Sequence, residues 1–183
     1  MRFVRVAIAA VVLGVIQLAF GWRFALWRVA PDLLLILAAF VIIALPPVDR
    51  IPTACTIGLW SDFLTGGRLG MMALGYGLGV WVVNAASPLI GTPGGARARS
   101  WPGRALGVTV ITLVGGAVAH LAVALVSQLL GTTSWHLGAA LLRAFGISLY
   151  SSAAAPIVWL VLAVTLGPVD RDAWSSRPNV VES

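Results

Sequence analysis

The fold class of this chain is decided by residues 105–142, which read ALGVTVITLVGGAVAHLAVALVSQLLGTTSWHLGAALL and contain no Asp, Glu, Lys or Arg. Two further uncharged runs cover residues 69–96 and 144–169. An apolar run of about 18 or more residues is typical of a helix that crosses a lipid bilayer. The sequence therefore predicts an all-α membrane protein with several spans.

The composition agrees with a membrane protein. Of the 183 residues, 60% are hydrophobic and 10% are charged, and the mean hydropathy is +0.98. The net charge of +6 comes from 12 basic residues, all arginines. They are spread over loops, which favours a role in membrane orientation and argues against nucleic-acid binding. Cys55 is a lone thiol, so we expect neither a disulfide nor a metal site.

We expect one integral membrane domain over residues 1–183, with spans at about 3–21, 31–45, 52–64, 69–86, 105–130 and 137–166 and a cytoplasmic tail at 167–183. Pro31 suits the first turn of the second span. Pro46 and Pro47 end that span, and Pro52 begins the third. The third span rises only about 20 Å, whereas the hydrocarbon core is about 30 Å thick. No small-residue cleavage site follows the first span, so we expect it to be retained.

The arginines predict the orientation of the six-helix bundle. With the N-terminus inside, the cytoplasmic segments hold Arg2, Arg5, Arg50, Arg97, Arg99, Arg104, Arg171 and Arg177, and the outer loops hold Arg23, Arg28 and Arg68. This bias predicts that both termini are cytoplasmic. Five or seven spans would place the termini on opposite sides. The basic loop at 87–104 is expected to contact anionic lipid, or alternatively to dock a protein.

Four charged residues are expected at one depth near the outer leaflet. Asp32 lies in the first turn of the second span, Asp62 near the end of the third and Arg68 in the next loop. Arg143 lies within the sixth span. An ionisable group in a membrane segment is costly unless it is paired or used. We predict that the four residues form a network, which either fixes helix register or binds a ligand or partner.

Small residues four apart predict close helix contacts, within the bundle or alternatively between proteins. They are Gly66 and Gly70, Gly75 and Gly79, and Ala140, Ala144, Ser148 and Ser152. His120 is expected to be a hydrogen-bonded core residue, and Pro156 is expected to kink the last helix. The sequence contains no glycine-rich phosphate loop, nucleophile elbow or zinc-protease motif. We therefore expect no catalytic residue, metal or cofactor.

Two segments carry a recognisable pattern. The first is Pro31-Asp32-Leu33-Leu34-Leu35-Ile36. The second is Gly58-x-x-x-Asp62-Phe63-Leu64-Thr65-Gly66-x-x-Leu69-Gly70-x-x-Ala73-Leu74-x-Tyr76. In this order and separation they resemble the opening of the second helix, and the glycine–aspartate–glycine signature across helices 3 and 4, of the bacterial rod shape-determining MreD family. The resemblance covers residues 31 to about 83.

This resemblance implies a non-catalytic scaffold of the cell-wall elongation complex in the bacterial cytoplasmic membrane. Members of the family associate with MreC, and through it with RodA, its transpeptidase partner and MreB filaments. Their fold is similar to the S components of energy-coupling-factor vitamin transporters, so a substrate-binding transport subunit is the alternative. S components meet their coupling subunit through an Ala-x-x-x-Ala face on the first helix. The first span here offers Ala10-x-x-x-Gly14 instead, which disfavours that alternative.

Overall fold

Six helices account for most of the described chain in a computed structural model, which describes residues 2–21, 23, 29–90, 101–131 and 137–166. They are α1 (Arg2–Phe20), α2 (Leu33–Ala44), α3 (Pro47–Thr65), α4 (Met71–Ile90), α5 (Trp101–Leu129) and α6 (Leu137–Leu166). Most of the basic loop and the predicted cytoplasmic tail lie outside the described residues.

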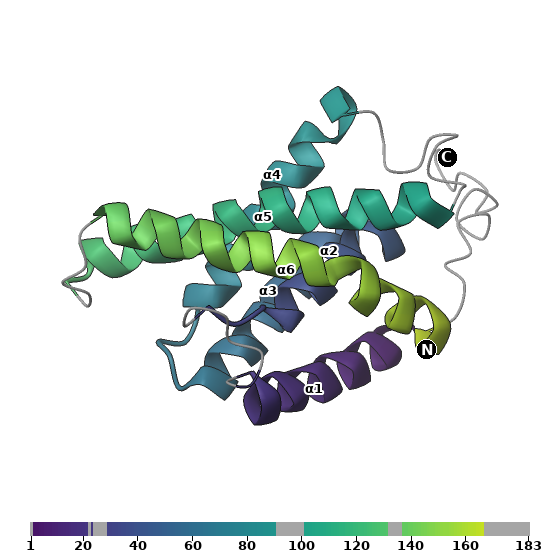
Figure 1. Ribbon diagram of the computed structural model, residues 1–183, viewed down its shortest axis with the longest axis horizontal. Coiled ribbons are helices and arrows are strands. Elements are labelled where there is room, and N and C mark those ends of the chain that lie inside the picture. Colours follow the sequence, from purple (N-terminus) through teal and green to yellow (C-terminus); the bar gives the residue numbers. More distant parts are fainter. Residues whose placement is uncertain (1, 22, 24–28, 91–100, 132–136, 167–183) are drawn as a thin grey trace, which may run out of the picture.

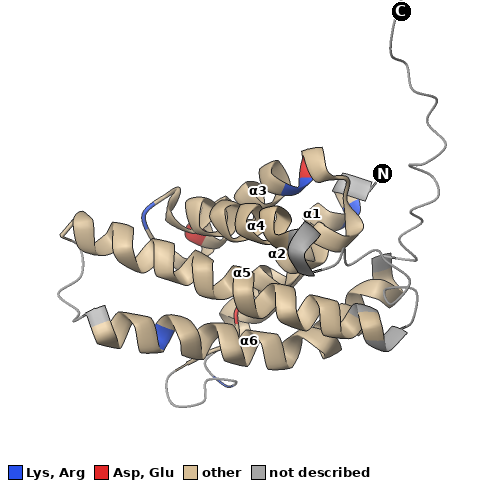
Figure 2. Cartoon of the chain, turned by 90° about the horizontal axis from the view of Figure 1, so that it is seen from above, with Lys and Arg blue, Asp and Glu red and all other residues tan. Residues whose placement is uncertain are grey.

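The helices form one bundle around α2. The two longest helices, α5 and α6, run antiparallel and side by side, α4 packs on α5, and α3 packs on α4 (Figure 1). On the other side of the bundle, α1 contacts α2, α3 and α6. The N-terminal end of α1 and the C-terminal end of α6 lie on the same side of the bundle (Figures 1 and 2).

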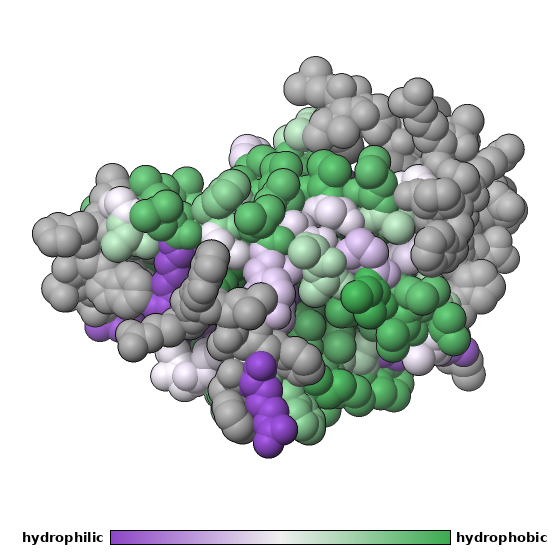
Figure 3. Space-filling view, viewed as in Figure 1, coloured by the Kyte–Doolittle hydropathy of each residue, from purple (hydrophilic) through white to green (hydrophobic). Residues whose placement is uncertain are grey.

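The outer surface of the bundle is apolar. Two segments, Ala105–Leu129 and Gly138–Thr165, are long and apolar enough to cross a membrane, and Val4–Phe20, Leu33–Ala44 and Met71–Ala86 are shorter apolar helices. Figure 3 shows hydrophobic side chains over large parts of one face. On α1, the exposed fractions of Val4 and Leu18 reach 61% and 64%. A soluble protein rarely exposes such continuous apolar surface, because water makes it costly.

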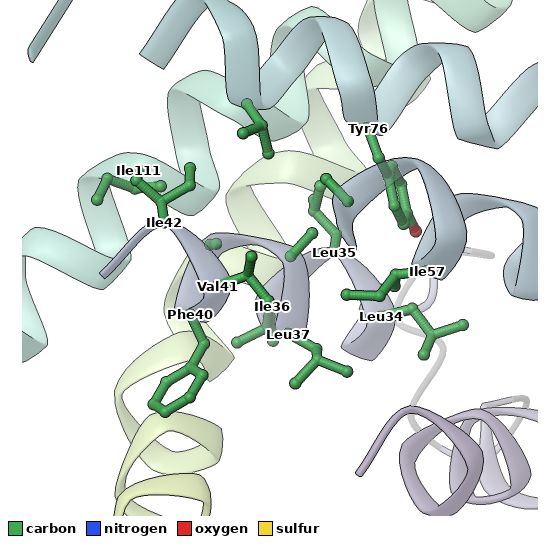
Figure 4. Packing of buried hydrophobic residues seen from close by; sticks show 14 of the residues in the cluster. Leu34, Leu35, Ile36, Leu37, Phe40, Val41, Ile42, Ile57, Tyr76 and Ile111 are labelled. Atoms are coloured by element: carbon green, nitrogen blue, oxygen red, sulfur yellow. The ribbon is translucent and has the colours of Figure 1, made fainter. Parts of the chain in front are cut away.

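The centre of the bundle is α2, which contacts each of the other helices. Every residue from Leu34 to Ile42 is buried, and Figure 4 shows their side chains among Ile57 of α3, Tyr76 of α4 and Ile111 of α5. A helix that is apolar all round is suited to such a buried position. With 12 residues it is about 18 Å long, well short of the roughly 30 Å hydrocarbon core.

The proline-based boundaries around α3 were partly wrong. Pro46 is extended and precedes α3, Pro47 takes its first position, and Pro52 lies inside the helix instead of beginning it. The first turn of a helix tolerates proline because its N–H groups have no partner within the helix. The short helix of the bundle is therefore α2, and α3 has 19 residues. Pro31 also lies before α2, whose N-cap is Asp32.

The predicted small residues divide into two groups. A Cβ on Gly75 would lie 2.8 Å from the Ala119 carbonyl oxygen, and one on Gly79 would lie 2.4 Å from that of Gly115, so α4 and α5 are in backbone contact there. Gly66 and Gly70 are different, because a Cβ there would meet nothing within 4 Å. Both have a positive φ, 63° and 96°, so they shape the turn between α3 and α4 and make no helix contact.

On α6, the predicted small residues Ala144, Ser148 and Ser152 are buried. The Ser148 hydroxyl donates to the carbonyl oxygen of Ala144 at 2.8 Å, so its polar group is satisfied within the helix. A Cβ on Gly116 of α5 would lie 3.1 Å from the Ser148 Oγ. This face of α6 therefore lies close against α5.

Candidate functional site

The carboxylate of Asp32 is the centre of a buried polar group at the start of α2. Its Oδ1 accepts the backbone N–H of Leu35 at 3.1 Å, as an N-cap residue does. Its Oδ2 accepts the hydroxyl of Tyr76, on α4, at 2.5 Å. The Nε2 of His120, on α5, lies 3.5 Å from the same oxygen. A single side chain thus connects α2 with two other helices.

Two further helices contribute to the same end of α2. The side-chain oxygen of Gln17, on α1, accepts the backbone N–H groups of Leu33 and Leu34 at 2.9 and 3.3 Å. The hydroxyl oxygen of Ser151, on α6, accepts the backbone N–H of Asp32 at 2.8 Å. We call these contacts the α2 cap cluster, which consists of Gln17, Asp32, Tyr76, His120 and Ser151.

The shortness of α2 explains why this cluster exists. The first N–H groups of any helix have no partner within the helix. In hydrocarbon each unsatisfied backbone group costs several kcal/mol, and a helix of about 18 Å cannot bring both of its ends to water across about 30 Å. The surrounding helices therefore supply the acceptors that water would otherwise provide.

The C-terminal end of α2 is stabilised by Arg50 of α3. Its Nε donates to the carbonyl oxygen of Leu45 at 3.0 Å, and its Nη1 donates to the side-chain oxygen of Asn84, on α4, at 2.6 Å. A cation at this end complements the negative end of the helix dipole. Both ends of α2 are thus held by residues from neighbouring helices.

The carboxylate of Asp62 caps the N-terminal end of α4, as Asp32 caps that of α2. Its carboxylate accepts the backbone N–H of Gly70 at 2.8 Å and that of Met72 at 2.9 and 3.1 Å. The C-terminus of α3 is closed by Gly66, whose N–H bonds to the Asp62 carbonyl oxygen. The stretch from Asp62 to Gly70 is therefore a helix–turn–helix joint in which the carboxylate at the end of one helix caps the start of the next.

The hydrogen bonds found for the two carboxylates of the predicted network, Asp32 and Asp62, are not with its arginines. The contacts of Asp62 are to backbone N–H groups, and those of Asp32 are to the backbone, a phenol and an imidazole. Arg68 is exposed in the turn after α3 and is not among these partners. A helix start offers several converging N–H donors, which satisfy a carboxylate without an arginine.

Sequence reasoning also missed residues of the α2 cap cluster. Tyr76 belonged to the recognised pattern without an assigned role, and Gln17 and Ser151 were not singled out. The available signal was polarity, because Gln17 interrupts an apolar run. His120 was expected to be a hydrogen-bonded core residue. It is buried beside Asp32, but its Nε2 makes no hydrogen bond with the described residues.

A cavity of about 250 Å³ lies between α5 and α6. Its polar lining consists of His120, Ser127, Gln128 and Arg143, and its apolar lining consists of Met72, Val123, Ala124, Ala140, Ala144 and Ile147. Most of these residues follow helical spacing along α5 and α6, so the cavity runs between the two helices. Arg143, predicted to join a network, lies here. The described residues contain no group of three or more His, Cys, Asp or Glu side chains that could hold a metal ion.

Comparison with known protein families identifies the chain. Residues 1–166 match the family described as rod shape-determining protein MreD. The chain belongs to the MreD family. This confirms the resemblance seen in the two segments, makes the chain a membrane protein, and implies a role in rod shape determination. No curated protein and no solved structure matches it.

The two segments that resemble MreD meet in space. The first contributes Asp32 and the second contributes Tyr76, and these side chains are hydrogen-bonded to each other. Within the second segment, a Cβ on Gly58 would lie 2.5 Å from the backbone of Ala73, so this glycine lets α3 approach α4. Asp62 then caps α4. The MreD pattern in this chain thus coincides with residues that join α2, α3 and α4.

Proposed function

We propose that this chain is a non-catalytic scaffold of the bacterial cell-wall elongation complex in the cytoplasmic membrane. In this role it binds MreC and thereby supports RodA, its transpeptidase partner and MreB. The observation that carries the proposal is the use of its two buried carboxylates. Asp32 and Asp62 each cap the start of a helix. A carboxylate held by backbone N–H groups maintains a rigid bundle, which is what a scaffold requires.

We further propose six membrane spans with both termini in the cytoplasm. The start of α1 and the end of α6 lie on one side of the bundle, as an even number of crossings requires (Figures 1 and 2). Basic residues near the starts of α1 and α3 also lie on this side (Figure 2). The turn between α3 and α4, which contains Arg68, lies at the opposite side (Figure 1). The positive-inside rule therefore favours the side with the two termini as the cytoplasmic one.

The packing of α1 argues against a transport subunit. Ala10 is buried, with an exposed fraction of 7%. A Cβ on Gly14 would lie 2.5 Å from Leu64 and 2.8 Å from Trp60, both on α3. The small face of α1 is thus used inside the bundle, whereas a transport subunit would need such a face for its coupling subunit.

Affinity purification tests the scaffold against the transport subunit. The full chain, tagged and expressed in its own host, is expected to co-purify with MreC and to restore rod shape when the chromosomal copy is depleted. Recovery of transporter ATPase subunits together with a vitamin, and no MreC, would refute the scaffold.

A further inference from the structure

The hydroxyl group of Thr112, on α5, has no hydrogen-bond partner among the described residues. The residue is fully buried, with an exposed fraction of 0%. Two comparable hydroxyls are satisfied within their own helices: Thr109 donates to the carbonyl oxygen of Ala105 at 3.0 Å, and Ser148 makes the same kind of bond on α6. A buried hydroxyl without a partner is costly. Thr112 therefore needs a partner other than the described residues.

A small cavity lies beside this hydroxyl, where α2, α4 and α5 meet. Thr112 lines it, and Leu35, Tyr76 and Ile111, labelled in Figure 4, form part of its apolar wall. Its volume, counted as the space open to the centre of a water molecule, is about 10 Å³. One water molecule needs about 10–15 Å³ on this measure. The cavity therefore has room for a single water molecule and for little more.

The contact between α4 and α5 offers further polar partners to a molecule in this cavity. Gly79 and Gly115 both line the cavity, and neither has a side chain that covers its peptide groups. The Gly79 carbonyl oxygen lies 3.6 Å from the position that a Cβ on Gly115 would take. A helical carbonyl oxygen that accepts one N–H retains a second lone pair. Thr112 and Gly115 are three residues apart and thus share a face of α5.

We propose that this cavity is the binding site of one structural water molecule that bridges α4 and α5. The water accepts the O–H of Thr112 and donates to the carbonyl oxygens of Gly79 and Gly115. These three hydrogen bonds are the usual number for a buried water molecule. An apolar occupant would leave the Thr112 hydroxyl unpaired, so it does not fit the site.

The site lies beneath α2, the central helix of the bundle. Ala38 and Ala39 of α2 line the cavity and are buried, and their small side chains leave space for the water. Neither side chain can form a hydrogen bond, so α2 covers the water while α4 and α5 hold it. This inference concerns the interior of the bundle and does not depend on MreC binding.

Nuclear magnetic resonance of the full chain in deuterated micelles tests the proposal. Transfer of magnetisation from water to methyl groups of an otherwise deuterated chain detects a long-lived water molecule close to them. The methyl groups of Ala38 and Ala39 are expected to receive this transfer. Ala54 and Ala155 are the reference positions, because they are also buried but do not line the cavity.

Three variants separate the hydroxyl group from the shape of the side chain. Thr112→Val removes the hydroxyl at nearly constant shape, so transfer to Ala38 and Ala39 should fall to the reference level. Thr112→Ser keeps the hydroxyl and should retain the transfer. Thr109→Val is the matched control on the same helix and should also retain it, because the Thr109 hydroxyl already has a partner.

Thermal unfolding provides a second readout, in which the sign of the change is informative. Thr112→Val should lower the midpoint by about 2–4 °C, because the bound water loses one of its partners, and Thr109→Val should shift it less. A higher midpoint for Thr112→Val would show that the hydroxyl is unpaired in the native protein and would overturn the proposal. Transfer to Ala38 and Ala39 that is at the reference level in the wild-type chain, or that survives Thr112→Val unchanged, would also overturn it.

Discussion

Asp62 is stabilised in an apolar environment by backbone groups. The N–H groups of Gly70 and Met72 point at its carboxylate, where the positive end of the α4 dipole also favours a negative charge. The sequence shows that such a carboxylate needs a partner, because an unpaired charge in hydrocarbon is costly. The partner could not be predicted, because it depends on the positive φ values of Gly66 and Gly70, which fold the chain back onto Asp62.

Substitution of Asp62 should weaken the bundle in graded steps. Asp62→Ala removes the acceptor for two backbone N–H groups and should lower the free energy of unfolding by about 1–3 kcal/mol. Asp62→Asn retains one acceptor oxygen and should cost about half as much, since asparagine is also a good capping residue. Denaturant titration in micelles measures both. Arg68→Gln is the control, and a loss for Asp62→Ala no larger than for this control would contradict the capping role.

The Tyr76–Asp32 hydrogen bond gives a second test at this scale. Tyr76→Phe keeps the ring packed and removes the hydroxyl that donates to the carboxylate. We therefore expect the free energy of unfolding to fall by about 1.5–3 kcal/mol. In an Asp32→Asn background the same substitution should cost less, with a coupling energy of about 0.5–3 kcal/mol. The matched control is Tyr150→Phe, on α6, which removes the hydroxyl of the only other tyrosine in the sequence. Strict additivity of the two substitutions would show that the bond contributes nothing.

At the scale of single helices, the apolar pattern and the length of a segment predict where a helix lies better than the positions of proline do. The predicted segment 137–166 has the bounds of α6, whereas α5 begins at Trp101, four residues before the predicted segment 105–130, because the helix continues past Arg104. The boundary between α2 and α3 was wrong, because Pro46, Pro47 and Pro52 allow more than one interpretation. Only the tertiary structure, in which the Arg50 side chain donates to the carbonyl oxygen of Leu45, distinguishes these interpretations.

Paired glycine substitutions test the contact between α4 and α5. Gly79→Ala places a methyl group 2.4 Å from the Gly115 carbonyl oxygen, which forces the helices apart and should cost about 1–3 kcal/mol. Gly107→Ala, also within a helix, meets nothing within 4 Å and should stabilise α5 by about 0.5–1 kcal/mol. Thermal unfolding of the two variants should therefore shift in opposite directions. A shift in the same direction for both would show that helix propensity, and not the contact, governs Gly79.

In the whole molecule, the interior is mainly apolar but also holds a few buried polar side chains, and the outer surface is apolar as well. Asp32, Tyr76, His120 and Ser151 of the α2 cap cluster are buried, whereas large apolar side chains of α1, α5 and α6 are exposed. The hydropathy alone predicts the fold class, an all-α membrane bundle with an apolar outer surface. The hydropathy does not predict which helices contact one another, because most apolar segments are equally able to pack against any other. The central position of α2 depends on its short length and on polar residues from four other helices.

Cysteine labelling tests the orientation of the whole molecule. Cys55 is first replaced by serine, because it is the only native thiol. In intact spheroplasts, a membrane-impermeant maleimide is expected to label Thr133→Cys and not Arg99→Cys. After permeabilisation it should label both. Labelling of position 99 from outside would reverse the inside–outside assignment, and labelling of both positions from outside would rule out six alternating crossings.

The dependence of α2 on its neighbours has a consequence for how the protein is made. The ribosome completes α2 before it synthesises Tyr76, His120 and Ser151, so the newly made helix lacks three residues of its eventual cap cluster. Leaving the translocon early would expose its uncapped N–H groups to lipid. We therefore expect α2 to remain beside the insertion machinery until α6 emerges. A nascent chain stalled after residue 90 should still cross-link to the translocon from position 36, whereas one extended to residue 183 should have lost that cross-link.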